Sequence, residues 1–157
     1  MAKIISRNIT QIVTEMNKAV TIAVKNASNR LLIKLQEYIN EDFYNLYQPL
    51  YYDRTMSFYN SAVAKMLSGN SASIGIDDDY FNFEYKKSYT SQSANITKSD
   101  NVHWTGEDQI NMAEAGFHGN VGIYRDGHFF SDFLDYCDKN ALNILREELI
   151  KQGITLK

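Results

Sequence analysis

The sequence predicts an α+β fold in which long N- and C-terminal helices pack on a small antiparallel sheet. Apolar residues recur every three or four positions in the first third of the chain and again from Phe130, which indicates amphipathic helices. Between these segments Phe81, Phe83 and Tyr85 alternate with polar residues, which is typical of a half-buried strand. A chain of 157 residues can bury one core, so a single domain is expected over residues 1–157.

The first predicted element is a long basic helix within residues 1–47. Its apolar positions are Ile5, Ile9, Ile12, Met16, Ala19, Ala23, Ala27, Leu31, Leu35, Ile39, Phe43 and Leu46. Asn8 followed by Gln11 fits a capping box, and nothing interrupts the pattern before Pro49. A helix from about residue 8 to 46 is about 58 Å long, which exceeds the width of a compact domain of this size. Part of it is therefore expected to project or to pack on a neighbouring subunit.

Residues 48–127 are predicted to hold a hinge, a short helix, strands and loops. Asp53 or Thr55 is a candidate cap for a second helix, which runs to about Leu67 and ends at the turn 68–71. Its apolar side would carry Met56, Tyr59, Val63 and Met66.

Two strands and a loop are expected next. Residues 73–76 and 80–85 read as strands that are joined by the acidic turn 77–79. Residues 88–101 are rich in Ser, Thr and Asn, which predicts a long loop; the composition leaves open whether this loop is disordered until it meets a partner.

The remainder is predicted to be mostly helical. A short helix is expected from Glu107 to Ala115, with Thr105 as its cap and Gly116 as its stop. An irregular stretch with a short strand at 121–125 follows. The C-terminal segment, 128–157, then forms a helix from Phe130 that ends at Gly153.

Aromatic side chains crowd around the only proline of the chain. Pro49 lies within nine positions that hold four tyrosines, between residues 44 and 52. Tyrosine combines a large apolar ring with a polar tip, which suits interfaces. We interpret this stretch as a packing hinge and interface, in which Arg54 can pair with an acid nearby or on a neighbouring subunit. The residues assigned to it are Tyr47, Pro49, Tyr51, Tyr52, Arg54 and Thr55.

Charge is distributed unevenly along the chain. Residues 1–36 carry six Lys/Arg and one acid (+5), whereas residues 37–157 carry ten bases and eighteen acids (−8). A basic arm on an acidic body favours head-to-tail association of copies. Arg7, Lys18 and Lys25 share one side of the first helix; they form either a solvated face or a basic stripe towards something anionic.

The sequence contains no convincing catalytic or metal-binding set. The gaps between His103, His118, His128 and Cys137 match no compact zinc spacing. Cys137 falls on the apolar side of the last helix, and one cysteine cannot form an internal disulfide. We therefore predict a protein that is not an enzyme and holds neither metal nor cofactor.

A secretory or membrane location is not expected either. The N-terminus becomes polar within a few residues, so a signal peptide is not predicted. The longest apolar run falls far short of the ~20 residues that a membrane span needs. These features predict a soluble intracellular product.

Residues 47–55, Tyr-Gln-Pro-Leu-Tyr-Tyr-Asp-Arg-Thr, resemble the tail-completion (neck) proteins of long-tailed bacteriophages. In that family a long N-terminal helix leads into a Tyr-x-Pro-x-x-Tyr-x-Arg-Thr-like stretch, and residues 52–55 match it best. The order helix, hinge, sheet, helix agrees over most of the chain, and residues 141–153 look like the closing helix of the family. Residues 88–127 have no counterpart in it.

The resemblance implies a structural virion protein of the phage neck, assembled in the host cytoplasm. Its partners would be copies of itself in a ring, commonly of six, together with connector or portal-side proteins and tail-tube or terminator proteins. DNA would pass through the channel without sequence-specific binding, and no membrane would be involved. A tail terminator or another ring-forming joining protein is the nearest alternative. The alternative from another class is a small metal-dependent nuclease or toxin that uses Asp77–Asp79, Glu84 and the histidines.

Overall fold

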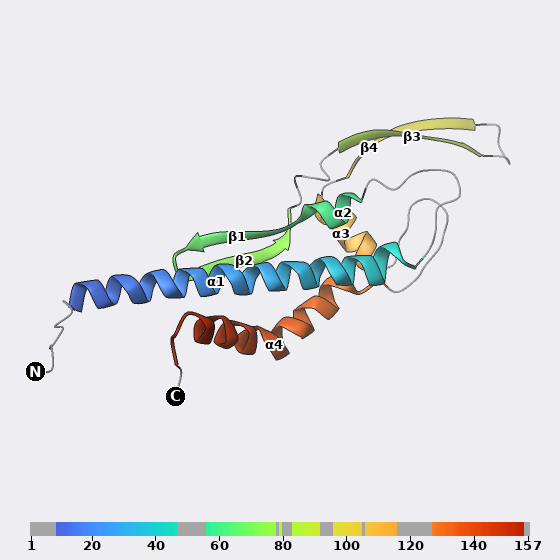
Figure 1. The fold of residues 1–157 in the computed structure, drawn as a ribbon. Coiled ribbons are helices and arrows are strands. Elements are labelled where there is room, and N and C mark those ends of the chain that lie inside the picture. Colours follow the sequence, from blue (N-terminus) through green and yellow to red (C-terminus); the bar gives the residue numbers. More distant parts are fainter. Residues whose placement is uncertain are drawn as a thin grey trace, which may run out of the picture.

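The computed structural model describes residues 9–46, 56–77, 79, 83–91, 96–104, 106–115 and 127–155 (Figure 1). It has an α+β fold with a long N-terminal helix, a long C-terminal helix and antiparallel strands, which confirms the predicted fold class. The elements are α1 (Ile9–Ile39), the π-helical turn η1 (Asn40–Tyr44), α2 (Ser57–Ser61), β1 (Ala62–Ser68), β2 (Ser71–Ile76), β3 (Phe83–Ser91), β4 (Ile96–Trp104), α3 (Gly106–Glu114) and α4 (Phe129–Lys151).

The predicted N-terminal helix is confirmed over residues 9–44, as α1 followed by η1. The 31 residues of α1 span about 46 Å at the usual helical rise. Helical spacing places its buried residues on one face. These are Ala23, Ala27, Ser28, Leu31, Leu35 and Ile39.

The helix ends in a wider turn that the apolar pattern did not predict. The N–H of Asn45 donates to the carbonyl of Asn40, five residues back, at 2.8 Å. Tyr44 at the end of this turn is buried, and its hydroxyl accepts a hydrogen bond from the N–H of Phe58 at 3.1 Å. The ring of Phe43 lies with its centroid 4.8 Å from that of Phe58 and 6.4 Å from that of Phe129. The turn therefore anchors the end of α1 to α2 and to the start of α4.

The prediction that the second helix reaches Leu67 is wrong. α2 stops at Ser61, and the next seven residues form β1, which pairs with β2. Gly69 and Asn70 make a two-residue connection between β1 and β2, and such a connection is typical of a hairpin. The turn at 68–71 was thus predicted in the right place, but it joins two strands instead of ending a helix. The candidate caps at positions 53 and 55 lie outside the described residues.

The predicted pairing of strand 73–76 with strand 80–85 is also wrong. β2 pairs with β1 in antiparallel register, from Ala62 opposite Ile76 to Ser68 opposite Ser71. Asp77, the first acid of the predicted turn, donates its N–H to the carbonyl of Ser61 at 2.8 Å and so closes the open end of this hairpin. The later of the two predicted strands belongs to a different sheet.

A second hairpin replaces the loop that was predicted over residues 88–101. β3 and β4 are paired antiparallel from Phe83 opposite Trp104 to Ser91 opposite Ile96. A two-stranded ribbon needs only matching backbone donors and acceptors, which a Ser- and Thr-rich segment supplies as well as any other. Composition was therefore a poor guide to this segment.

Both later helices were predicted correctly. α3 agrees with the predicted helix to within one residue at each end, and α4 forms the C-terminal helix. Gly153 has a φ of +81°, its N–H donates to the carbonyl of Ile150, and the N–H of Ile154 donates to the carbonyl of Leu149. This pair of bonds is the Schellman motif, which explains why the helix stops there. The predicted cap Thr105, the stop Gly116 and the strand at 121–125 lie outside the described residues.

The core lies where α1, α4 and the β1–β2 hairpin meet. Figure 1 shows α1 between the other two, with the hairpin along one side and α4 along the other. Its buried hydrophobic residues, among those the structure describes, come from α1, η1, β1, α3 and α4: Ala27, Leu31, Leu35, Ile39, Tyr44, Ala62, Ala113, Phe129, Phe133 and Ile144. Because α1 contributes the most of them, its position determines how the other elements pack.

Candidate assembly surface

The first turns of α1 are uncovered and carry an apolar face. Residues 9–18 are all exposed, and their large apolar side chains are 77% (Ile9), 41% (Ile12), 49% (Val13) and 52% (Met16) exposed. Their spacing of three, one and three residues places them on one side of the helix. We call these four residues the α1 stripe.

The α1 stripe continues the face that is buried further along the same helix. Ala27 lies eighteen residues after Ile9, about five whole turns, so both point to the same side of α1. Ala23 and Ala27 are 0% and 6% exposed. The stripe is therefore core-like in position and composition but lacks, among the described residues, elements that cover it.

Two contacts show where the β1–β2 hairpin and α4 begin to cover α1. A Cβ added to Gly69 in the β1–β2 turn would lie 3.1 Å from the hydroxyl of Thr21, so the hairpin reaches α1 there. Near the end of α4, the carboxylate of Glu148 accepts a hydrogen bond from Asn26 at 3.4 Å. In Figure 1 the first turns of α1 extend past both the hairpin turn and the end of α4.

The opposite side of this helical segment is polar. Lys18 lies two and a half turns after Ile9 and thus faces away from the α1 stripe; Lys25 follows Lys18 by seven residues and shares its side. Both lysines are exposed. Two members of the predicted basic stripe therefore lie on one exposed side of α1, whereas Arg7 lies outside the described residues.

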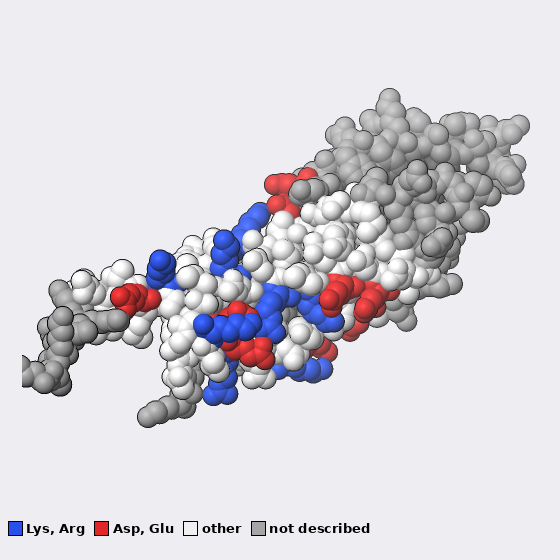
Figure 2. Space-filling model, in the orientation of Figure 1, with Lys and Arg blue, Asp and Glu red and all other residues white. Residues whose placement is uncertain are grey.

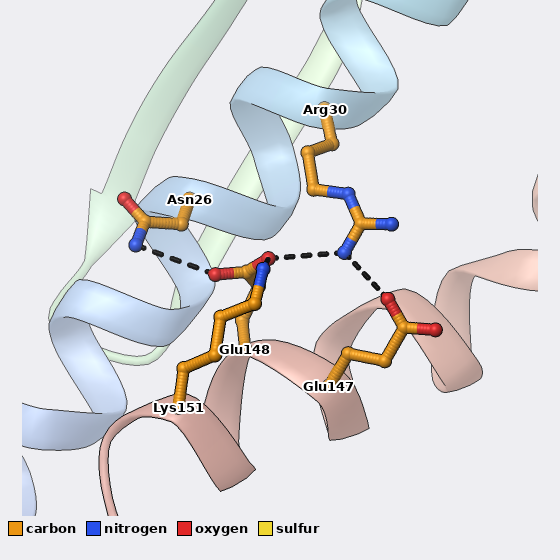
Figure 3. Close-up of polar contacts among 5 residues, drawn as sticks. All are labelled: Asn26, Arg30, Glu147, Glu148 and Lys151. Carbon is orange, nitrogen blue, oxygen red and sulfur yellow. Dashed lines mark hydrogen bonds and ion pairs between the residues drawn. The ribbon is translucent and has the colours of Figure 1, made fainter.

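A buried carboxylate fastens α1 to α4 just after the uncovered segment. Glu148 is 3% exposed and accepts hydrogen bonds from three donors (Figure 3). Lys151 donates at 2.7 Å, Arg30 at 3.0 Å and Asn26 at 3.4 Å. Arg30 also contacts Glu147 at 2.8 Å. Two of the three donors belong to α1, so this cluster fixes the point at which α1 leaves the rest of the fold.

The same contacts control the ionisation of Glu148. The hydrogen bond from Lys151, followed by that from Arg30, lowers the pKa of this carboxyl, although its burial acts in the opposite direction. In Figure 2 acidic and basic side chains are intermixed on the face where α1 and α4 meet. The helix pair is thus held by charge as well as by apolar packing. Glu148 itself was not predicted from the sequence, although its place four residues after the buried Ile144, on the apolar side of α4, was a usable signal.

The other end of α4 is held by α3. The carboxylate of Glu114 accepts hydrogen bonds from the N–H groups of Phe130 and Ser131, both at 2.9 Å, and from the hydroxyl of Ser131. It thereby acts as the cap for the first turn of α4, where a negative charge is also favoured by the helix dipole. Gly127 makes this close approach possible, because an added Cβ would lie 2.4 Å from the carbonyl oxygen of Ala113.

The predicted hinge falls outside the described residues. This applies to Tyr47, Pro49, Tyr51, Tyr52, Arg54 and Thr55. The residues that flank it are described, and they pack together through the rings of Phe43 and Phe58. The two ends of the undescribed segment therefore lie close together, and the role of the residues between them stays a prediction.

The residues considered for catalysis belong to different elements or lie outside the described residues. Among the described residues there is no group of three His, Cys, Asp or Glu side chains that could hold a metal ion. Cys137 is half-buried, and burial followed by the charge of Asp138 raises the pKa of its thiol. His128 begins α4 and is exposed, His103 belongs to β4, and His118 lies outside the described residues. The described helices include none that is long and apolar enough to cross a membrane.

Of the acids considered for cation binding, Asp77 is engaged by a lysine within the β1–β2 hairpin. The carboxylate of Asp77 lies 3.0 Å from the ammonium group of Lys65, and this hydrogen bond lowers the pKa of Asp77. Asp79 is exposed, Asp78 lies outside the described residues, and Glu84 belongs to β3. Asp77 thus has a structural partner within the β1–β2 hairpin.

Comparisons with protein-family models, with curated proteins and with solved structures found no match. What the chain can do must therefore be argued from its own surfaces. The uncovered start of α1 is such a surface, because it exposes four large apolar side chains on one helix face.

Proposed function

We propose that this chain is a structural protein of the bacteriophage neck, which joins head and tail through contacts between subunits and performs no catalysis. The observation that carries the proposal is the α1 stripe. Four large apolar side chains on one helix face, 41–77% exposed, are costly in water and are stabilised when another protein covers them. A protein that assembles with others can bury such a surface in its contacts with neighbouring subunits.

Two further features support assembly. The cluster around Glu148 fastens α1 to α4, so the uncovered start of α1 is presented at a defined angle to the rest of the fold. The resemblance of residues 47–55 to neck proteins supplies the specific context. In that context the exposed side of Lys18 and Lys25 faces either the DNA channel or the acidic surface of a neighbour.

Particle composition tests the proposal. Phage particles are purified from the strain that carries the gene, and the chain is located with gold-labelled antibodies. We expect labelling at the head–tail junction, and we expect deletion of the gene to give filled heads and free tails that join when the protein is added back. Complete infectious particles that lack the chain would overturn the proposal, whereas tails of uncontrolled length would favour a tail terminator.

An assay for nuclease activity tests the alternative class. The purified chain is incubated with supercoiled plasmid and Mg²⁺ or Mn²⁺. Intact plasmid is expected, because Asp77 is already engaged by Lys65. Metal-dependent nicking that disappears on Asp77→Asn substitution would replace the structural function with an enzymatic one.

A further inference from the structure

The strands β3 and β4 form a two-stranded ribbon whose outer edges are open. The two strands pair with each other, and neither makes an extensive contact with another described element. Figure 1 shows the ribbon extending away from α1, α4 and the β1–β2 hairpin. Among the described residues, no third strand pairs with either edge. An isolated strand pair is only marginally stable in water, and an open edge presents backbone N–H and C=O groups that a further strand can pair with.

The register of the ribbon gives its two faces different compositions. Residues that are opposite each other share a face, and the faces alternate along each strand. The even-numbered positions of β4 with their β3 partners form a face that is rich in aromatic and apolar residues, with Trp104 opposite Phe83, Val102 opposite Tyr85, Asp100 opposite Lys87, Lys98 opposite Tyr89 and Ile96 opposite Ser91. The odd-numbered positions form a polar face, with His103, Asn101, Ser99 and Thr97 opposite Glu84, Lys86, Ser88 and Thr90.

The sequence of β4 is complementary to itself in one antiparallel register. A second β4 continues both faces only when even-numbered residues are opposite even-numbered residues. With Ser99 opposite Ser99 of the second copy, the pairs on each side of this centre are Lys98 with Asp100, Thr97 with Asn101 and Ile96 with Val102. Opposite charges on neighbouring strands stabilise a sheet, whereas like charges directly opposite each other destabilise it.

Neighbouring registers and the other edge of the ribbon lack this complementarity. A pairing centred on position 98 places two lysines opposite each other, and one centred on position 100 places two aspartates opposite each other. A pairing of β3 with itself about its middle residue, Lys87, also opposes two lysines. The edge of β4 is therefore the better surface for a second copy of the same strand.

We infer that β4 pairs antiparallel with β4 of a second copy of this chain, centred on Ser99, and that the two ribbons form a four-stranded sheet in the order β3, β4, β4, β3. The occupant is argued from charge complementarity, because each contact contains two pairs of Lys98 with Asp100. Asp100 is also opposite Lys87 in its own ribbon, so it would lie between two bases. The inference rests on the proposed function, since it names one of the subunit contacts.

The contact is isologous, because both copies contribute the same strand edge. An isologous contact joins copies in pairs. A ring that used it in every subunit would therefore hold an even number of chains.

Solution mass measured across a concentration series tests the pairing. The intact chain is expected to dimerise. Lys98→Glu places an acid opposite Asp100 in both halves of the contact, so we expect the apparent dissociation constant to rise at least about tenfold. Lys86→Glu is the matched control, because it makes the same charge change on β3, which is the outer strand of the four-stranded sheet. An intact chain that stays monomeric at millimolar concentration, or a Lys98→Glu chain that associates like the control, would overturn the inference.

A mixture of two variants tests which residues are opposite each other. Chains with Lys98→Glu are mixed with chains that carry Asp100→Lys together with Lys87→Asp, a change that keeps opposite charges across β3 and β4. Each variant alone places like charges across the contact, whereas the mixed pair joins an acid to a base at every charged position. We expect the mixture to associate more tightly than either variant alone. A mixture that associates no more tightly would contradict the pairing of position 98 with position 100.

Cross-linking tests the centre of the contact. Chains with Ser99→Cys, which also carry Cys137→Ser, are oxidised and should form disulfide-linked dimers, because position 99 is opposite itself. Thr97→Cys in the same background is the control. Its two thiols would be four positions apart along the strand, about 13 Å at the usual strand rise. Equal yields of dimer from the two variants would refute this register.

Particle labelling and solution mass fail separately. A chain that labels the head–tail junction while Lys98→Glu associates like the control refutes only the β4 contact. A chain that is absent from particles while Lys98→Glu dissociates refutes the neck function and leaves the contact standing.

Discussion

The guanidinium group of Arg30 in α1 lies 3.0 Å from the carboxylate of Glu148 in α4, a side chain that is only 4% exposed. Arg30 is itself 40% exposed, so the pair is formed by a buried acid and a cation at the edge of the fold. A buried carboxylate is tolerated only when hydrogen-bond donors surround it. Asn26 and Lys151 donate the other two hydrogen bonds to this carboxylate. This contact joins the two longest helices at the point where α1 begins to project.

Removal of Glu148 is expected to weaken the joint between α1 and α4. Glu148→Ala leaves Arg30 and Asn26 without their shared acceptor and opens a cavity, so we expect the free energy of unfolding to fall by about 2 kcal/mol. Urea denaturation followed by circular dichroism measures it. Glu147→Ala is the matched control, because Glu147 also contacts Arg30 but is 57% exposed, and its loss should cost about 0.5 kcal/mol or less. Equal losses for the two variants would contradict a special role for the buried acid.

The stability should also depend on pH through Glu148. Its folded-state pKa is lowered, chiefly by the hydrogen bond from Lys151, so the folded state binds fewer protons than the unfolded state while this group titrates. The stabilisation is therefore complete above the unfolded pKa and is lost as pH falls through the folded pKa. Unfolding of the intact chain and of Glu148→Gln is compared between pH 7 and pH 3. We expect the variant to lose less stability on acidification; parallel curves would assign the acid sensitivity to other carboxyls.

The long helices were predictable because their signals are local and repeated. Nine of the regularly spaced apolar positions lie in α1, and Gly153 supplies the stop of α4 through its positive φ. β1 was missed because Ala62, Lys65, Met66 and Leu67 are all good helix formers, whereas pairing with β2 and packing on α1 decide the outcome. Local propensity cannot report contacts with distant segments.

The candidate surface was only partly predictable for the same reason. The length of the first helix predicted that some of it would project, but the sequence could not say where cover by β2 and α4 would stop. Glu148 lies on an apolar helix face, which marks it as unusual. Its partners Asn26 and Arg30 are more than a hundred residues away, so only the folded chain identifies them.

A side chain at Gly127 should disturb the contact between α3 and α4. Gly127→Ala places a Cβ 2.4 Å from the carbonyl oxygen of Ala113, which belongs to the backbone and cannot rotate away. We expect the free energy of unfolding to fall by about 2–3 kcal/mol, because the start of α4 must shift from its cap on Glu114. Gly75→Ala provides the comparison, since an added Cβ there meets nothing within 4 Å and should change stability by about 0.5 kcal/mol or less. A Gly127→Ala protein as stable as Gly75→Ala would show that α3 does not dock in this way.

Ionisation of Asp42 in η1 is expected to lower the stability of the fold, whereas ionisation of Glu148 raises it. Within the described residues its Oδ2 is buried without a hydrogen-bond partner, and burial, followed by the charges of Asp132 and Glu41, raises the pKa of this carboxyl. The folded state thus holds a proton that the unfolded state has already released. Ionisation of Asp42 therefore costs stability as pH rises from the unfolded pKa, near 4, through the raised folded value.

Asp42→Asn removes this cost because the amide carries no charge. We expect the variant to melt a few degrees higher than the intact chain at pH 7, with the difference shrinking towards zero below about pH 4, where the native carboxyl is protonated as well. Thermal unfolding at a series of pH values measures both effects. Glu41→Gln serves as the control, because Glu41 is exposed next to Asp42. Its substitution should raise the melting temperature by less than Asp42→Asn does. A gain at pH 7 that persists unchanged at pH 3.5 would show that shape, and not charge, limits the fit of Asp42.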